Sequence, residues 1–261
     1  MTAILQTSRA KSQPDIEITD GRYLVKIAES PGEIESALRL RYQVFSIELG
    51  GAPESCEGPR IEFDEFDLSC RHLLVVDRTT SQTVGTYRLN SIENAKCIDG
   101  FYSNREFSLE DLPSEVLSGG IEIGRACIAA EHRNTKVLFL LWKGLVAHLQ
   151  ATGKRYFFGC CSIFTDDESV GSSAYRQLFE SGHVHENFRV TPRANAVDID
   201  RVAGESIELP GLFNMYLRMG AKVCGAPIVD RDFGTIDFFV VCDTEQIDGK
   251  YRKMFFQKTK R

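Results

Sequence analysis

A nearly unbroken apolar run in the middle of the chain most strongly constrains what this sequence can fold into. Residues 155–164 (RYFFGCCSIF) carry few polar side chains, which is typical of a β-strand buried on both faces. Residues 134–152 come before it, have an apolar helical pattern and end at Gly153, a residue that commonly terminates a helix. Because such a strand needs cover on both faces, this region predicts a sheet flanked by helices.

The elements around this run alternate between strand and helix patterns. Pro31 opens a helix whose apolar residues recur at steps of three and four until Gly50-Gly51. Further strands are expected at 22–29, 72–77, 84–90, 120–129 and 235–242, and further helices at 109–117, 172–181 and 212–219. This order predicts an α/β protein of the mixed α+β kind, with one mixed, mostly antiparallel sheet.

The length of 261 residues allows a single large domain. We expect a loose segment at 1–20, one domain over 21–257 with a polar insertion at 183–209, and a basic tail at 258–261.

Composition excludes several classes of protein. The formal net charge of −6 argues against nucleic acid as a partner, because binding phosphates requires a broad basic face. The longest apolar run, 137–149, contains Lys143 and His148 and is too short to span a membrane. The N-terminus lacks the apolar core of a signal peptide, so we expect a cytoplasmic protein. No cluster of Cys or His has the spacing of a metal site, so we expect no bound metal.

Two charged residues stand in the apolar strand predicted at 120–129. Glu122 and Arg125 flank Gly124, and glycine inside a strand often marks a bulge that would turn both side chains toward one cleft. A structural ion pair and a functional site are equally good interpretations of this pattern.

Other charged groups are candidates for ligand binding. Asp64 and Asp67 lie in a long acidic loop and suit either a cationic amine or the capping of a turn. Arg41 and Arg88 fall in predicted core elements, and with Arg125 they suggest a ligand that carries a carboxylate. No nucleophile elbow or phosphate-binding loop is present. Cys127 and Cys161 are expected to be buried, inert thiols.

An ordered set of short motifs resembles a known family. The set comprises RYxVFxxELG (41–50), FDxFD (63–67), HLLVxD (72–77), VGTYRL (84–89), GFYSxxEF (100–107), EIGRAC (122–127), LWxG (141–144), FGC (158–160), YLRxGA (216–221) and DxxFGTxD (230–237). Together these motifs resemble the ornithine-lipid N-acyltransferases, also labelled hemolysins, which have the GNAT acyltransferase fold. The resemblance covers about residues 22–257.

The resemblance implies an activity and a donor. Members of that family move a 3-hydroxyacyl chain from the phosphopantetheine thioester of acyl carrier protein to the α-amine of ornithine, giving lyso-ornithine lipid. No bound cofactor is implied. The arrangement of Arg41, Asp64, Asp67, Arg88, Glu122 and Arg125 is also similar to that of acyl-homoserine-lactone synthases, which use the same kind of donor.

The donor loop departs from the GNAT pattern. Enzymes of that fold that use acetyl-CoA carry an R-x-x-G-x-G/A loop that cradles pyrophosphate, whereas this chain has RNTKVL at 133–138, with Lys136 and Leu138 in place of the small residues. The crowded loop favours acyl carrier protein, and Arg133 and Lys136 are the candidate donor-binding residues.

The chemistry of amine acylation suggests a role for each remaining candidate. The amine must lose a proton before it attacks the thioester, and we assign Glu122 as the base. A strand N–H near 124–126 is expected to stabilise the oxyanion, and Arg125 or Arg88 to hold the amino-acid carboxylate. Asp64, Asp67, Asp230 and Asp237 are the candidates for binding the side-chain ammonium of ornithine.

Alternatives stay open at this point. An N-acyl amino acid synthase with another acceptor, such as glycine, is the nearest alternative, and a non-catalytic protein that acts on membranes belongs to a different class. The basic, aromatic residues 250–261 suit an anionic membrane surface or acidic acyl carrier protein. They are equally consistent with a solvated tail.

Overall fold

The computed structural model describes residues 16–50, 60–97, 100–200 and 206–256. The chain divides into two compact units that are interleaved in sequence. Unit 1 comprises Met1–Asp99, Ile123–Lys154 and Phe255–Arg261, and unit 2 comprises Gly100–Glu122 and Arg155–Met254. The expected single domain over 21–257 stays a prediction. The expected basic tail at 258–261 lies outside the described residues.

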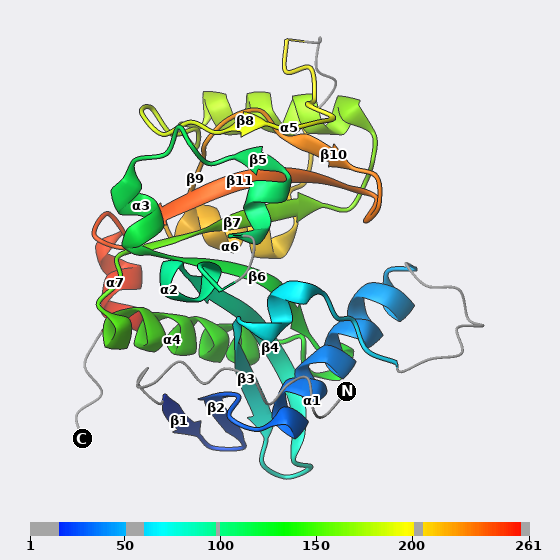
Figure 1. Ribbon diagram of the computed structural model, residues 1–261, viewed down its shortest axis with the longest axis vertical. Coiled ribbons are helices and arrows are strands. Elements are labelled where there is room, and N and C mark those ends of the chain that lie inside the picture. Colours follow the sequence, from blue (N-terminus) through cyan, green and yellow to red (C-terminus); the bar gives the residue numbers. More distant parts are fainter. Residues whose placement is uncertain (1–15, 51–59, 98–99, 201–205, 257–261) are drawn as a thin grey trace. The chain divides into compact units, whose positions relative to one another are not determined.

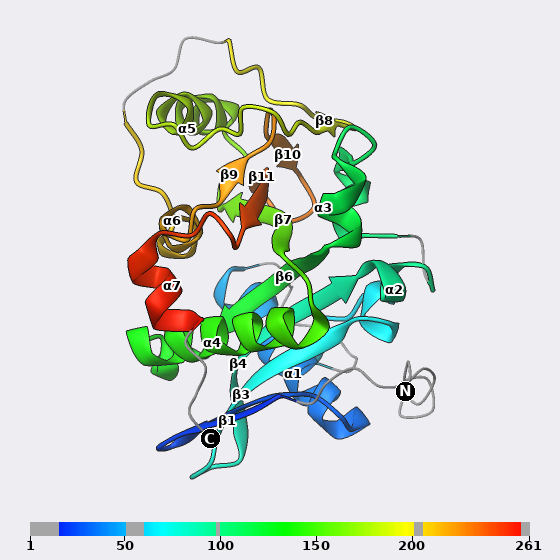
Figure 2. The same cartoon turned by 90° about the vertical axis from the view of Figure 1, so that its left-hand side faces the viewer.

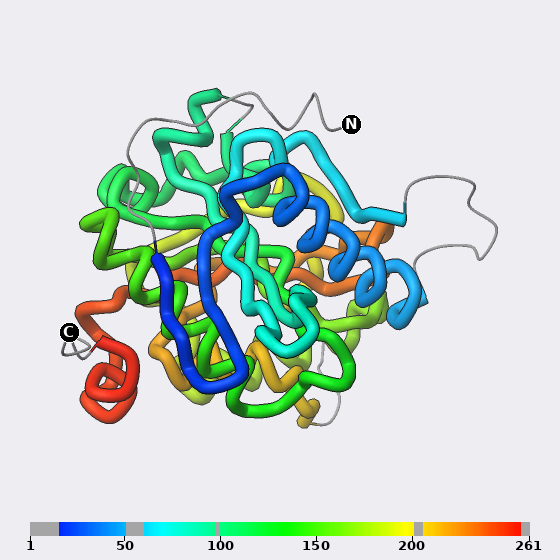
Figure 3. The backbone as a smooth tube through the Cα atoms, turned by 90° about the horizontal axis from the view of Figure 1, so that it is seen from below, coloured from blue at the N-terminus to red at the C-terminus, as the bar shows by residue number. Residues whose placement is uncertain are grey.

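Unit 1 contains a sheet with strand order β1-β2-β3-β4-β6, in which the first four strands pair antiparallel. Figure 1 shows α1 and α4 against β3 and β4, and the β1–β2 hairpin is the dark-blue loop of Figure 3. The elements of this unit are β1 (Glu17–Asp20), β2 (Tyr23–Ile27), α1 (Pro31–Arg41), the π-helix η1 (Tyr42–Glu48), the 3₁₀ helix η2 (Glu65–Leu68), β3 (Arg71–Asp77), β4 (Gln82–Ser91), α2 (Ile92–Ala95), most of β6 (Gly120–Ile128), the 3₁₀ helix η4 (Ala130–His132) and α4 (Thr135–Thr152).

Local sequence explains the two main helices of unit 1. Ser30 and Glu33 form a capping box around Pro31 at the start of α1. The Asn134 side chain caps α4, and Gly153 ends it in the left-handed conformation with φ 65°. Inside α4, Gly144 allows close packing on the sheet, since a Cβ there would lie 2.7 Å from Val25 and 2.8 Å from Leu73.

Unit 2 is built around β7 (Tyr156–Ile163) and β11 (Thr235–Asp243), both almost wholly buried. The residues of β6 that belong to this unit pair parallel with β7; β7 pairs antiparallel with β11, and β11 with β10 (Ile228–Asp230) and β9 (Lys222–Val223). The remaining elements are the 3₁₀ helix η3 (Tyr102–Arg105), β5 (Phe107–Ser108), α3 (Ser114–Ser118), α5 (Glu168–Glu180), β8 (Thr191–Pro192), α6 (Gly211–Arg218) and α7 (Gly249–Phe255), the last ending in unit 1. Figure 2 shows β7, β9, β10 and β11 grouped together.

Most predicted elements are confirmed, and mixed, mostly antiparallel pairing is the observed class. Three expectations were wrong in detail. Residues 17–20, expected to be loose, form β1 because they pair with β2. The first helix changes to π-helical geometry after Arg41. The helix expected over 109–117 begins only after Pro113, because proline lacks the N–H that an interior position needs. The insertion expected at 183–209 stays a prediction; its described residues are tied into unit 2 by β8 and by bridges from Val184 to Val223 and from Ala196 to Ile228.

Candidate active site

Five of the predicted site residues meet in one ion-pair network in unit 1. We call it the arginine–carboxylate network, and its members are Arg41, Glu62, Asp64, Asp67, Arg88 and Arg125. Three guanidinium groups face three carboxylates, so the formal charges balance. The predicted ligand-binding roles of these arginines and aspartates stay predictions.

Arg41 is the deepest member of the network. It is the last residue of α1 and has no solvent-exposed surface. Its Nη1 and Nη2 donate to the two carboxylate oxygens of Asp67 at 2.6 and 3.1 Å, and its Nε donates to Glu62. Bidentate pairing of this kind fixes both side chains in orientation as well as in distance.

Asp64 and Asp67 shape the acidic loop while they pair with arginines. Asp64 is the N-cap of η2: its carboxylate accepts from Phe66 N, and the Asp67 carboxylate accepts from Asp64 N, both at 2.9 Å. The turn-capping interpretation is therefore confirmed for both residues. Burial raises the pKa of Asp67, but the guanidinium groups of Arg41 and Arg88 outweigh it and hold that pKa well below its usual range.

Arg88 and Arg125 complete the network from β4 and β6. Arg88 donates to Asp64 at 2.6 Å and to Asp67 at 3.2 Å. Burial lowers the pKa of Arg88, but Asp67 and Asp64 raise it, so it stays charged. Arg125 donates to Glu62 at 3.0 Å and to Asp64 at 3.3 Å. Arg125, and not Gly124, is where β6 becomes irregular, with φ 50° in a region that non-glycine residues rarely adopt.

His72 lies next to Asp67 of the network, and the sequence did not predict this contact. Its Nε2 is 3.8 Å from Asp67 Oδ1, and the ring is almost wholly buried. Burial lowers the pKa of His72 to about 4, so the ring is neutral at pH 7.

Glu122 belongs to unit 2 and makes contacts of another kind. The side chain is buried, and it accepts three hydrogen bonds: from Tyr102 N at 3.0 Å and from Ser103 N and Oγ at 2.7 Å each. These donors satisfy the buried carboxylate oxygens and fix their orientation. The shared cleft that we expected for Glu122 and Arg125 stays a prediction.

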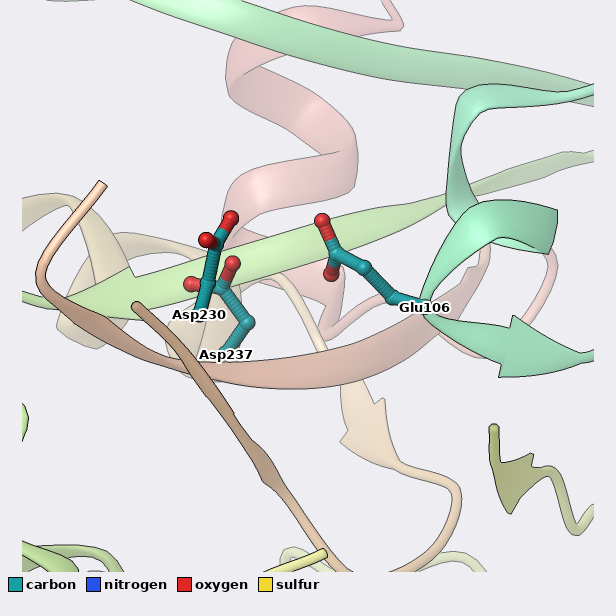
Figure 4. Close-up of side chains that lie close together, drawn as sticks. All are labelled: Glu106, Asp230 and Asp237. Atoms are coloured by element: carbon teal, nitrogen blue, oxygen red, sulfur yellow. The ribbon is translucent and has the colours of Figure 1, made fainter. Parts of the chain in front are cut away.

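A second carboxylate cluster in unit 2 unites Asp230 and Asp237 with a residue that sequence reasoning missed. The members of this acidic triad are Glu106, Asp230 and Asp237, and one carboxylate oxygen from each lies within 4.8 Å of the others. Figure 4 shows the three side chains pointing toward one another from β10, β11 and the segment before β5. Carboxylates are suitable ligands for a cation, either an ammonium group or a metal ion.

Glu106 is the least compensated member of the triad. It is 8% exposed, and neither of its oxygens has a hydrogen-bond partner among the described residues. Burial and the negative charges of Asp237 and Asp230 raise the pKa of Glu106 to about 8, although the nearby Cys160 thiol and Tyr102 lower it. The only sequence signal for Glu106 was its place in the GFYSxxEF motif, to which we had assigned no role.

The candidate donor-binding residues lie at the start of α4. Arg133 pairs with Glu48 and donates to Ile128 O at 3.0 Å, and Lys136 pairs with Asp20 at 3.1 Å. Both side chains are about half exposed, at 47% and 50%. Neither contacts the arginine–carboxylate network in the part of the chain that the structure describes.

Cys127 and Cys161 are confirmed as buried thiols. Cys127 and Cys161 are buried, and burial raises the pKa of Cys127 to about 12 and that of Cys161 well above its usual value. Burial and, to a lesser extent, the charges of Glu106 and Asp237 raise the pKa of Cys160 well above its usual value. Thiols that stay protonated are unreactive.

Comparison with known proteins defines the class. The model of the acetyltransferase (GNAT) domain matches residues 40–143. Among solved structures, FeeM, an N-acyl amino acid synthase from uncultured soil microbes, has a TM-score of 0.51 at 11% identity over 87% of this chain and 94% of its own. TofI, solved in a ternary complex with an inhibitor and MTA, has a TM-score of 0.50 at 16% identity over 90% and 97%. The chain is an acyltransferase with the GNAT fold.

Curated relatives identify the family within that class. The L-ornithine N(alpha)-acyltransferase of Brucella abortus is 32% identical over 88% of this chain and 88% of the relative. That of Rhodobacter capsulatus is 32% identical over 90% and 95%, and that of Rhizobium meliloti is 33% identical over 87% and 81%. The chain belongs to the L-ornithine N(alpha)-acyltransferase family, as its motifs indicated.

In the part of the chain with described coordinates, every helix is too short or too polar to cross a bilayer.

Proposed function

We propose that this protein transfers an acyl chain, with a 3-hydroxyacyl chain as the expected substrate, from acyl carrier protein to the α-amine of ornithine, giving lyso-ornithine lipid. The observation that carries the proposal is the similarity to ornithine acyltransferases along 87–90% of the chain.

The proposed reaction needs a base but no covalent enzyme intermediate. The α-ammonium of ornithine gives a proton to Glu122, directly or through water, and the free amine attacks the thioester carbon. The carbon–nitrogen bond forms as the carbon–sulfur bond breaks, and the phosphopantetheine thiol leaves with a proton. The three hydrogen bonds from Tyr102 and Ser103 support this role because they hold the Glu122 carboxylate in place.

Arg125 is proposed to bind the acceptor carboxylate, with Arg88 as the alternative. The geometry supports Arg125 more strongly, since its contacts to Glu62 and Asp64 are longer, at 3.0 and 3.3 Å, than the 2.6 Å contact from Arg88 to Asp64. Arg88 is also more buried, at 5% exposed compared with 14% for the Arg125 side chain. Arg41, Asp64 and Asp67 are then positioning residues, because their hydrogen bonds fix the arginines.

The start of α4 supports acyl carrier protein as the donor. Asn134 Oδ1 already accepts from Val137 N at 3.0 Å, so one of the amides that would cradle a pyrophosphate is occupied. The half-exposed Arg133 and Lys136 are proposed to bind the phosphate of phosphopantetheine or the acidic surface of the carrier protein.

Association with a membrane surface is proposed through the C-terminal basic residues. Lys250, Arg252 and Lys253 are exposed on α7, and each basic residue contributes about 1 kcal/mol near an anionic bilayer. Loss of binding to anionic liposomes in a chain that lacks residues 258–261 would support this placement, and unchanged binding would argue for a solvated tail.

A reconstituted assay tests the proposed reaction. The purified protein is incubated with 3-hydroxyacyl carrier protein or with the matching acyl-CoA, and each donor is combined with a panel of amino acids that includes ornithine and glycine. Mass spectrometry should detect acyl-ornithine with the carrier-protein donor. Acylation of glycine alone would identify a different N-acyl amino acid synthase, and turnover of acyl-CoA alone would overturn the donor assignment.

A further inference from the structure

We infer that Glu106, Asp230 and Asp237 form the subsite that binds the side-chain ammonium of the amino-acid acceptor, and that Glu106 makes the enzyme specific for a basic amino acid. The inference rests on the proposed function and goes beyond it by naming the residues that select the acceptor.

The geometry of the triad matches a primary ammonium group. An ammonium group carries three N–H donors and no acceptor, and the triad offers three carboxylates from three different segments (Figure 4). Acceptors arranged tetrahedrally around a nitrogen at hydrogen-bond distance lie about 4.5 Å apart. The oxygens of the triad all lie within 4.8 Å of one another, so three acceptors can reach one ammonium nitrogen at the same time.

Glu106 gives an indication of a ligand that is independent of the two aspartates. Asp230 and Asp237 lie on paired strands, where a cross-strand turn alone would bring them close. Asp230 also has a structural role, because its Oδ1 accepts from Asp232 N and Phe233 N in that turn. Glu106 reaches them from the far end of η3, and it is more than nine-tenths buried with neither oxygen hydrogen-bonded. Burying an unpaired acid beside two others is costly unless a cation compensates for it.

Burial favours an ammonium over a hydrated metal ion. Magnesium keeps several waters, and calcium takes six to eight oxygen ligands. Glu106 and Asp237 are 8% and 4% exposed, which leaves little space for water around an ion. An ammonium needs only the three acceptors that are present.

The triad is connected to the proposed base through the segment that carries Glu106. Ser103 donates to Glu122, and the Cys160 thiol lies 3.6 Å from Ser103 Oγ and next to Glu106. The same short stretch, 102–106, therefore contacts the proposed base and supplies one acid of the triad. This arrangement suits an acceptor with two amines, one that reacts and one that is held.

Ornithine and norvaline provide the test, because they have the same carbon chain and norvaline lacks the terminal amine. We would measure their binding by calorimetry and their acylation by kcat/KM for the wild type and for the Glu106→Gln and Asp230→Asn variants. Each variant should weaken ornithine binding and lower its kcat/KM by about 30-fold or more, with norvaline changed by less than about threefold. The exposed Glu115→Gln in the same unit is the matched control and should leave both values unchanged.

Other results would overturn the inference. Equal losses for ornithine and norvaline in Glu106→Gln would make Glu106 part of the catalytic apparatus, and an unchanged preference would remove the subsite. Binding of magnesium or manganese that Glu106→Gln abolishes, without a change in ornithine affinity, would make the triad a metal site. If the wild type acylates no amino acid, the proposed function fails, but the ornithine titrations with and without Glu106 still decide the subsite.

Discussion

The arginine–carboxylate network and the acidic triad bury the same chemical group in opposite ways. In the network, each carboxylate faces a guanidinium, and the pKa of Asp67 falls below its usual range. In the triad, the charges that act most strongly on Glu106 are those of other carboxylates, and its pKa rises to about 8. The charges of the network therefore balance before a substrate binds, whereas the triad is stabilised when a cation arrives.

Glu122 is a third kind of buried carboxylate, because backbone N–H groups and a hydroxyl group stabilise it instead of guanidinium groups. Replacing it with Gln should produce the largest effect on activity, because an amide cannot accept the proton of the amine. We expect kcat/KM to fall by about 10²–10⁴, as measured with saturating carrier-protein donor.

The fold of this variant has to be checked separately. Gln keeps an acceptor oxygen for Ser103 but turns an NH2 group toward Tyr102 N, so Glu122→Gln should melt a few degrees below the wild type and still be folded at the assay temperature. Full activity in the folded variant would remove Glu122 as the base. The Glu115→Gln protein is again the matched control.

The network can be broken at its most buried member. Arg41→Met should lower the free energy of unfolding by about 3–5 kcal/mol, because it leaves the buried Asp67 carboxylate with one of its two guanidinium partners missing. Urea denaturation at pH 7 measures this change.

Arg39 on the same helix provides the contrast. It forms an exposed pair with Glu35, and such pairs contribute about 0.3–0.5 kcal/mol. Arg39→Met should therefore have little effect on stability. Similar losses for the two variants would mean that the network contributes no more than surface pairing.

Elements that depend on local signals could be predicted from the sequence. The limits of α4 follow from the Asn134 cap and from Gly153, and β7 follows from its apolar run. The π-helical turn after Arg41 could not be predicted, because no residue type encodes it. The strands β9 and β10 are two and three residues long, too short for periodicity to show.

The candidate site was only partly predictable for a related reason. The arginines of the network were singled out because they stand in apolar segments, where a charge needs an explanation, but their pairing with Glu62, Asp64 and Asp67 was not predicted. Glu106 stands in a segment without regular structure, and its partners follow more than a hundred residues later. Only tertiary structure brings them together, so pattern and spacing gave no reason to single it out.

The pKa of Glu106 is raised and that of His72 is lowered, and the two shifts predict opposite dependences of stability on pH. The folded-state pKa of Glu106 is raised from 4.5 to about 8, so the folded protein binds an extra proton in this interval and loses stability as the pH rises through it. Neutral His72, with its pKa lowered to about 4, acts in the other direction. The other histidines whose pKa is lowered, His148, His183 and His185, do the same, because their unfolded-state pKa of about 6.5 lies at the edge of the same interval. The difference between the wild type and Glu106→Gln over pH 6.5–8 therefore isolates the contribution of Glu106.

In that window, the free energy of unfolding of the wild type should fall by roughly 2 kcal/mol because of Glu106. Glu106→Gln should remove this slope, and urea denaturation at pH 6.5, 7.25 and 8 measures it in both proteins. Parallel curves for the two proteins would show that Glu106 is not protonated in the free enzyme. Ornithine at saturating concentration should also flatten the curve of the wild type, since a bound ammonium favours the ionised triad.

The smallest expected effect lies outside both clusters, at the start of α4. Arg133 and Lys136 are half exposed and form surface pairs with Glu48 and Asp20, so replacing both with Ala should change the free energy of unfolding by less than about 1 kcal/mol. If they bind the carrier protein, the KM for acyl carrier protein should still rise by about threefold to tenfold, and the rise should shrink as salt is added because exposed charges are screened. Kinetics at 50 and 300 mM salt measure this, with the exposed Lys96→Ala of the same unit as the control. An unchanged KM at low salt would move the donor site away from α4.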